Sequence, residues 1–307
     1  MTGEDLEAIL GQLARTIRPS PAGADAIAVN DGLHFTGGEP FLNFDLLCRA
    51  VEIADELGIP STFVETNCTW AASDRIASDR LALLRDKGLR GILISVNPFF
   101  LEHVPFERTE RTVRAAVKIF DRNVIVYQLD YYRRFRQWGI KSRMPLEEYL
   151  RLEGPGAFAG NVEFFPMGRA PFALDRELGE AFARRRAERF FGEPCWPPMI
   201  RNWHNHFDNY SNYMPGFCGG ISLGDCRDLE SLTTRGVALD ERPILAFLIN
   251  DDMPGLYEFA RDRGYSESPR GYFSKCHLCV DLRRHLVARG DFPELAPAQM
   301  YEHLETA

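Results

Sequence analysis

Residues 61–98, STFVETNCTWAASDRIASDRLALLRDKGLRGILISVNP, decide the fold. The stretch contains two short apolar runs that predict strands, Ser61–Glu65 and Ile92–Val96. Between them lies an amphipathic segment that predicts a helix ending at about Lys87-Gly88. A strand, a helix and a second strand within this length are typical of a βα unit, which takes roughly 30 residues.

The same unit recurs on both sides of this stretch. Strands are predicted at Leu33–Phe35, Val124–Gln128 and Val162–Phe165, and the strand ends Thr36, Thr66, Ser95, Gln128 and Phe165 are 29 to 37 residues apart. Further helices are predicted after a Thr2 cap, after an Asn43 cap and over Glu107–Phe120. Alternating strands and helices indicate an α/β fold with a parallel sheet or barrel. The repeat stops after about Ala170, and residues 176–191 predict a separate charged helix.

Composition narrows the class of protein. The 307 residues are 45% hydrophobic and 26% charged, which is ordinary for a globular enzyme or binding protein. The net charge of −8 argues against nucleic acid as a partner, because phosphate binding needs a basic surface. No apolar run reaches the length of a membrane helix and no signal peptide is evident, so we expect a cytoplasmic protein that contacts no membrane. In a reducing compartment, its seven cysteines are expected to be buried, metal-bound or catalytic.

One candidate site lies at the carboxyl ends of the predicted strands. In Phe35–Leu42, Gly37 and Gly38 allow a ligand to approach the backbone, Glu39 can accept hydrogen bonds from a ligand ammonium, and Pro40 fixes the following turn. Parallel strands bring their carboxyl ends to one edge, where α/β proteins place their ligands. The same edge should therefore receive the polar residues that end the next two strands, Thr66, Asn67, Ser95 and Asn97.

A second candidate site is built from cysteines. Cys276 and Cys279 form a CxxC pair at a predicted helix start, and Cys218 and Cys226 form a second pair across a tight hairpin. Four thiolates suit zinc or an iron–sulfur cluster, and Cys195 is a further candidate ligand. His204 and His206 would share one face of a strand, but no third ligand is evident and loop packing is the favoured interpretation.

The string Gly37-Gly38-Glu39-Pro40 closely resembles the GGEP motif of radical S-adenosylmethionine (SAM) enzymes. The strand ends Glu65-Thr66-Asn67, Ser95-Val96-Asn97 and Phe165–Ala170 are also similar to that family. The resemblance implies that residues 1–175 form a partial (β/α)6-type barrel that lacks its first strand. It further implies that Gly37, Gly38 and Glu39 contact the methionyl group of SAM, with Pro40 and Asn67 beside them. Thr66, Ser95 and Asn97 would face the ribose or the substrate.

Residues 190–307 resemble the SPASM or twitch extension that follows many radical SAM barrels. The resemblance implies a smaller, Cys-rich α+β domain holding an auxiliary 4Fe–4S cluster through Cys218, Cys226, Cys276 and Cys279. It also implies a reductant protein as a partner. The substrate is not defined by the sequence, although peptides are one class that such extensions accompany.

The chain departs from the family at its catalytic cluster motif, C-x3-C-x2-C, because none of its cysteines has that spacing. We expect the first strand and the cluster loop to lie upstream of Met1, in a longer protein. The expected function is therefore reductive cleavage of SAM followed by hydrogen abstraction. The alternatives are a catalytically inactive relative that binds SAM or metal, and a lyase or aldolase barrel with structural zinc.

Overall fold

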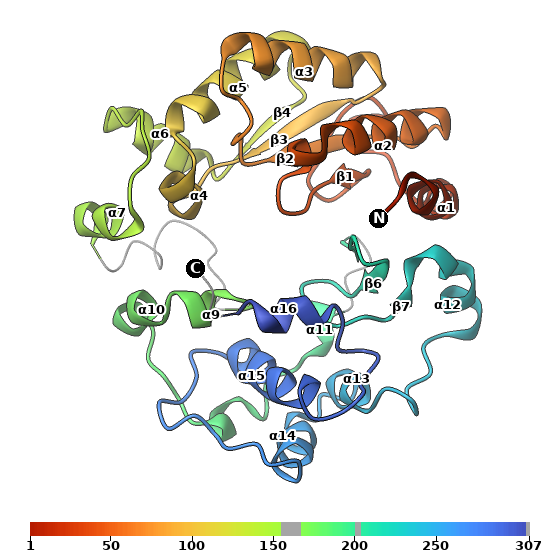
Figure 1. Ribbon diagram of the computed structural model, residues 1–307, viewed down its shortest axis with the longest axis vertical. Coiled ribbons are helices and arrows are strands. Elements are labelled where there is room, and N and C mark those ends of the chain that lie inside the picture. Colours follow the sequence, from red (N-terminus) through yellow and green to blue (C-terminus); the bar gives the residue numbers. More distant parts are fainter. Residues whose placement is uncertain (155–166, 200–203, 305–307) are drawn as a thin grey trace. The chain divides into compact units, whose positions relative to one another are not determined.

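The computed structural model describes residues 1–154, 167–199 and 204–304. The chain divides into two compact units, Met1–Ala157 and Phe158–Ala307. The first unit contains a four-stranded parallel sheet and the second a small three-stranded antiparallel sheet, so the protein is a mixed α/β protein (Figure 1). Within the described ranges, no helix has the length and apolar composition needed to span a membrane.

The parallel sheet follows the sequence repeat. Its strands run in the order β1-β2-β3-β4, and each pairs in parallel with the next. Four of the predicted strands are thereby confirmed to within two residues, whereas the prediction at Val162–Phe165 lies outside the described residues. The strand bounds are His34–Phe35 for β1, Phe63–Thr66 for β2, Gly91–Ser95 for β3 and Val124–Tyr127 for β4.

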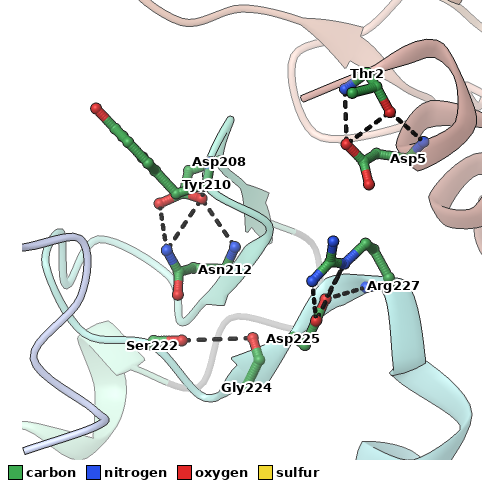
Figure 2. Close-up of polar contacts among 9 residues, drawn as sticks. All are labelled: Thr2, Asp5, Asp208, Tyr210, Asn212, Ser222, Gly224, Asp225 and Arg227. Carbon is green, nitrogen blue, oxygen red and sulfur yellow. Dashed lines mark hydrogen bonds and ion pairs between the residues drawn. The ribbon is translucent and has the colours of Figure 1, made fainter.

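Helices α1 to α4 of the first unit begin at side-chain caps that the sequence contains. The Thr2 hydroxyl accepts a hydrogen bond from the Asp5 backbone N–H at 3.1 Å, and the Thr2 N–H donates to the Asp5 carboxylate at 2.7 Å (Figure 2). This capping box satisfies two amide groups that the first turn leaves unpaired. The helical segments are α1 Gly3–Leu13, η1 Pro40–Asn43, α2 Phe44–Glu56, α3 Asp74–Asp86, α4 Pro98–His103, α5 Phe106–Phe120, α6 Leu129–Gln137 and α7 Leu146–Glu153.

The two faces of the sheet carry different side chains, because alternate residues of a strand point to opposite faces. Val64 and Thr66 of β2 share one face, and Phe63 and Glu65 share the other. The Thr66 face lies toward the helices, since Thr66 contacts Trp70, whose ring is 5.9 Å from the Arg80 guanidinium of α3. Glu65 therefore lies on the face turned away from α3.

The second unit is mostly helical. Its core gathers around α15, whose Leu278, Leu282 and Leu286 are fully buried, and around Ile244 and Leu256 of neighbouring helices. The antiparallel strands are β5 His206–Phe207, β6 Asn212–Met214 and β7 Gly224–Asp225. The helical segments are α9 Ala170–Ala173, α10 Asp175–Ala181, η2 Ala187–Phe190, α11 Trp196–Met199, η3 Cys226–Asp228, α12 Leu229–Arg235, α13 Pro243–Ile249, α14 Met253–Arg261, α15 Lys275–Val287 and α16 Ala298–Glu302.

The charged helix predicted over residues 176–191 is wrong as a single element. α10 ends at Ala181, and Arg185 instead forms a two-way backbone bridge with Tyr272, with both N···O distances 2.8 Å. This long-range pairing satisfies the backbone groups that a continuous helix would have used. Tertiary contacts thus override the local helical preference of the arginine run.

Helix α3 allows a matched test of the core of the first unit. Leu81 is fully buried, whereas Leu83 on the same helix is 42% exposed. We expect Leu81→Ala to lower the free energy of unfolding by about 2–5 kcal/mol, because it removes buried methyl groups and leaves a cavity. Leu83→Ala should change it by less than about 0.5 kcal/mol. Urea unfolding followed by circular dichroism measures both, and equal losses would contradict this packing.

Candidate functional site

Glu39 joins the carboxyl ends of β1 and β2. One of its carboxylate oxygens accepts from the Asn67 N–H at 2.8 Å and the other from the Phe41 N–H at 3.2 Å. Both oxygens also lie within 3.0 Å of the Thr66 hydroxyl, which donates to them. A carboxylate has about four lone-pair directions, so protein donors occupy this one almost completely. Glu39 is only 8% exposed, which makes it a residue that positions the turn.

The Thr66 hydroxyl is saturated in the same way. It donates to Glu39 and accepts from the Trp70 indole N–H at 2.8 Å and from the Cys68 N–H at 3.0 Å. One donor and two acceptor sites are all that a hydroxyl has. The Trp70 ring stacks on Phe41 with centroids 3.9 Å apart, which closes the cluster on its apolar side. Thr66 therefore holds the strand ends together and has no capacity left for a ligand.

Burial perturbs the ionisation of Glu39. Desolvation raises the pKa of its carboxyl group, while the hydrogen bonds from Asn67, Phe41 and Thr66 act in the opposite direction. Glu65 adds to the increase through like-charge repulsion. The three donors are what make a carboxylate tolerable at this buried position.

Glu65 forms a second link on the opposite face of the sheet. Its carboxylate accepts from the Ser95 hydroxyl at 2.7 Å and from the Thr36 hydroxyl at 3.1 Å, so it connects the ends of β1, β2 and β3. Sequence reasoning passed over Glu65 in favour of its neighbour Thr66. The signal was available, because strict alternation along β2 places these two side chains on opposite faces.

The two glycines leave the backbone of the β1 turn accessible. Gly37 has φ +131°, a conformation that L side chains rarely adopt, and both Gly37 and Gly38 are exposed. A Cβ added at either position would meet no protein atom within 4 Å. Because packing does not account for these glycines, the space beside them is available to a ligand. Pro40, the first residue of η1, fixes the exit of the turn.

The two asparagines have local structural roles. The Asn67 side-chain oxygen accepts from the Thr69 N–H at 2.9 Å, and the Asn97 oxygen caps α4 by accepting from the Phe100 N–H at 2.9 Å. Both residues nevertheless stand at the edge of the sheet where the sequence places them.

Gln128 marks the end of β4. It has a left-handed backbone, with φ 62°, and its buried side-chain oxygen finds no hydrogen-bond partner among the described residues. A strained backbone beside an unpaired buried acceptor is typical of a functional position. The sequence analysis used Gln128 only as a strand landmark.

In the second unit, α15 brings three cysteine-bearing segments together. Cys276 and Cys279 lie in its first turn, which Ser274 caps. The Lys275 ammonium donates to the Pro194 carbonyl, next to Cys195. The Arg283 guanidinium donates at 2.9 Å to the Gly219 carbonyl, next to Cys218. These two hydrogen bonds hold Cys195 and Cys218 against the CxxC pair.

The pKa values of these cysteines are raised by burial and by one another. Burial raises the pKa of Cys195 to about 11 and that of Cys218 to about 12, and Cys276 and Cys279 add to both increases. Burial, and then Cys279, also raise the pKa of Cys276. The thiols of Cys195, Cys218 and Cys276 are therefore protonated at neutral pH, and a metal would have to displace their protons.

Cys226 belongs to different surroundings. It begins η3 directly after β7, and its N–H donates to the Ser211 carbonyl at 2.9 Å. Burial raises its pKa to about 11, and its charged neighbours are Asp225, Asp208 and Arg227. Figure 2 shows the Asp225–Arg227 pair that follows β7. The structure thus brings Cys195 to the CxxC pair and places Cys226 apart from it.

Arg283 supplies a buried positive charge beside the cysteines. It is 4% exposed, its Nε finds no partner, and no carboxylate of the described residues forms an ion pair with it. Burial lowers its pKa, but Tyr301, Cys279 and Cys218 raise it by more. A buried charge normally has an opposite charge next to it. The neighbouring groups that can become anionic are the Tyr301 hydroxyl, which accepts from the guanidinium at 2.9 Å, and the thiols of Cys279 and Cys218.

The thiols as they stand are not a formed metal centre. In the described part of the chain, no three or more His, Cys, Asp or Glu residues are arranged to hold a metal ion. His204 and His206 contact each other, with ring centroids 4.6 Å apart, and Phe217 packs on His204. That contact is the loop packing favoured from the sequence.

Comparison with known proteins adds no family assignment. No protein-family model matches the chain, and no curated protein matches it.

Thr66 allows a direct test of the strand-end network. Thr66→Val keeps the side-chain shape but leaves Glu39, the Trp70 indole N–H and the Cys68 N–H without their shared partner. We expect the free energy of unfolding to fall by at least about 1–3 kcal/mol, the cost of one unsatisfied buried group. Thr66→Ser keeps the hydroxyl and should cost only about 1 kcal/mol. Denaturant unfolding measures both, and a valine variant as stable as the serine variant would refute the network.

Proposed function

We propose that this chain binds SAM at the carboxyl edge of its parallel sheet and belongs to a radical SAM-type enzyme. The observation that carries the proposal is the Gly37-Gly38 turn, which is exposed, lacks protein contacts at its Cβ positions and is fixed to β2 through Glu39. In this proposal the four parallel strands form part of a partial (β/α)6 barrel. The resemblance to the GGEP motif identifies SAM as the proposed ligand, and the exposed turn is its proposed binding position.

The hydrogen bonds at the carboxyl edge of the sheet suggest a different role for each residue. The Glu39 carboxylate is occupied by protein donors, so a ligand ammonium would meet the backbone carbonyls of the turn and Glu39 would act as a positioning residue. Glu65 and Ser95 lie on the face turned away from α3, where they would orient the ribose or the substrate. Asn67 and Asn97 would line the same edge.

In the family that the chain resembles, SAM bound against a reduced 4Fe–4S cluster supplies a radical that abstracts hydrogen from a substrate. The residues of this sequence do not include the C-x3-C-x2-C ligands of that cluster. We therefore propose SAM binding for the residues present here. SAM cleavage is proposed for the protein together with such a cluster and a reductant protein. The alternative is a SAM-binding or metal-binding relative without catalysis. The substrate class proposed for the enzyme is a peptide.

We also propose an auxiliary iron–sulfur site in the second unit, with Cys195, Cys218, Cys276 and Cys279 as ligands. The donor set fits, since four thiolates suit a 4Fe–4S cluster. The unpaired charge of Arg283 fits as well, because a thiolate-ligated cluster is anionic and would neutralise it. Cys226, which the sequence analysis included, is replaced by Cys195 in this set. Zinc would bind to the same four thiolates, so metal analysis distinguishes a zinc site from an iron–sulfur site.

Gly38→Ala tests the SAM site. The new methyl group meets no protein atom within 4 Å, so folding should be unaffected while a ligand lying against the backbone is displaced. We expect the SAM affinity to fall about tenfold or more, since a steric clash costs roughly 1–3 kcal/mol. Isothermal titration calorimetry with SAM measures it.

Gly11→Ala, in α1, is the matched control, because its added methyl group also meets no protein atom. It should leave SAM binding unchanged. If wild-type protein shows no SAM binding, or if both alanine variants bind equally well, the proposed site is wrong.

Single cysteine variants test the metal ligands. After anaerobic reconstitution with iron and sulfide, we expect Cys195→Ser to lose most of the bound iron and its charge-transfer absorbance. Cys226→Ser should keep both, because Cys226 has separate surroundings. Iron and sulfide analysis of each purified variant gives the result.

The opposite pattern, in which Cys226→Ser loses iron and Cys195→Ser keeps it, would restore the pairing expected from the sequence. Zinc without iron in the native protein, together with no SAM binding, would favour the lyase or aldolase alternative.

A further inference from the structure

A cavity lies wholly within the second unit and plays no part in the function proposed above. It has a volume of about 680 Å³ and is lined by residues of α9, α10 and α15 and of the loop between α14 and α15. This volume is within the roughly 300–1,000 Å³ that is typical of small-molecule sites.

The lining of the cavity carries more positive than negative charge. Three guanidinium groups, those of Arg184, Arg270 and Arg284, face two carboxylates, those of Asp175 and Asp281. Asp175 forms ion pairs with both Arg184 and Arg270. Two cations therefore share one anion, and a ligand with a negative charge would complete the balance.

Asp281 pairs with the third arginine, and its carboxylate also accepts from neutral hydroxyl groups. Its carboxylate pairs with Arg284 at 3.2 Å and also accepts from the Tyr265 hydroxyl at 2.7 Å. The Tyr272 hydroxyl lies 3.4 Å from the same carboxylate. The described lining thus holds three guanidinium groups and two carboxylates, which leaves one positive charge in excess.

Arg184 is held in place before any ligand arrives. Its side chain is 18% exposed, its guanidinium lies 4.1 Å from the centre of the Phe273 ring, and it donates to the Gly271 carbonyl at 2.9 Å. Burial, and then repulsion from the nearby Arg270, lower the pKa of Arg184. Both effects disfavour the positive charge on the Arg184 guanidinium. A fixed guanidinium in such a place binds an anion with little loss of side-chain entropy.

The cavity also offers aromatic surface. Phe172 and Tyr265 contribute to its wall, and the Arg284 guanidinium lies 5.1 Å from the centre of the Phe172 ring. A ligand that carries an apolar or aromatic part next to its anionic group would use both features.

We infer that this cavity binds a small molecule whose carboxylate or phosphate group contacts Arg184, Arg270 and Arg284 while an aromatic or apolar part lies against Phe172 and Tyr265. Both anions match the planar fork of arginine. The site requires neither SAM nor a metal, so it can be tested whether or not the function proposed above holds.

Calorimetric titration of the full chain with phenyl phosphate, phenylacetate and neutral benzyl alcohol tests the inference. We expect saturable binding of at least one anion and none of the alcohol. Stronger binding of phenyl phosphate identifies a phosphate ligand, and stronger binding of phenylacetate identifies a carboxylate. Arg270→Gln and Arg284→Gln should each weaken binding about tenfold or more, the loss expected for one charged hydrogen bond.

Arg261→Gln is the matched control. It removes the same charge from α14 of the same unit, where Arg261 pairs with Glu258 outside the cavity, and it should leave binding unchanged. The Arg270 side chain is 66% exposed, so its replacement keeps the test valid even if Arg284→Gln does not fold. Absence of anion binding by the folded chain at millimolar concentrations, or equal weakening by Arg261→Gln, would overturn the inference.

Discussion

The buried hydrogen bonds between Glu39 and Thr66 hold the carboxyl edge of the parallel sheet together. Neighbouring parallel strands are connected through helices, so no hairpin fixes their carboxyl ends relative to each other. Glu39 provides that fixation by binding the Asn67 backbone at the end of β2 from its place just after β1. Desolvation of the carboxylate is unfavourable, and the protein offsets it with three donors. The exposed Gly37-Gly38 turn is held rigid as a result.

Helix α15 has the corresponding role in the second unit. Its apolar residues form the centre of the core, while Lys275 and Arg283 reach out to the carbonyl groups beside Cys195 and Cys218. The cysteines thus meet because two long cationic side chains bind backbone oxygens of distant segments. The spacing of the cysteines along the sequence does not predict this arrangement.

The sequence predicts local structure well where one residue type has one role. Thr2 and Asn43 cap helices as expected, and the 30-residue repeat locates four parallel strands. It predicts less where the role depends on distant partners. The arginine run is not helical because Arg185 pairs with Tyr272. Glu39 is buried because Thr66 and Asn67 donate hydrogen bonds to its carboxylate. The sequence favours Cys226 as a ligand and offers Cys195 only as a further candidate, whereas the hydrogen bonds of α15 hold the segment of Cys195 next to the CxxC pair.

The first turn of α15 has one further consequence. Cys276 and His277 are consecutive, yet the first belongs to the cysteine group and the second lines the cavity of about 680 Å³. A rigid helical turn cannot adjust one of these side chains without moving the other. A metal bound at the proposed cysteine site and an anion bound in the proposed cavity would both act on this turn, and thermodynamic linkage would make any coupling between the two equal in both directions.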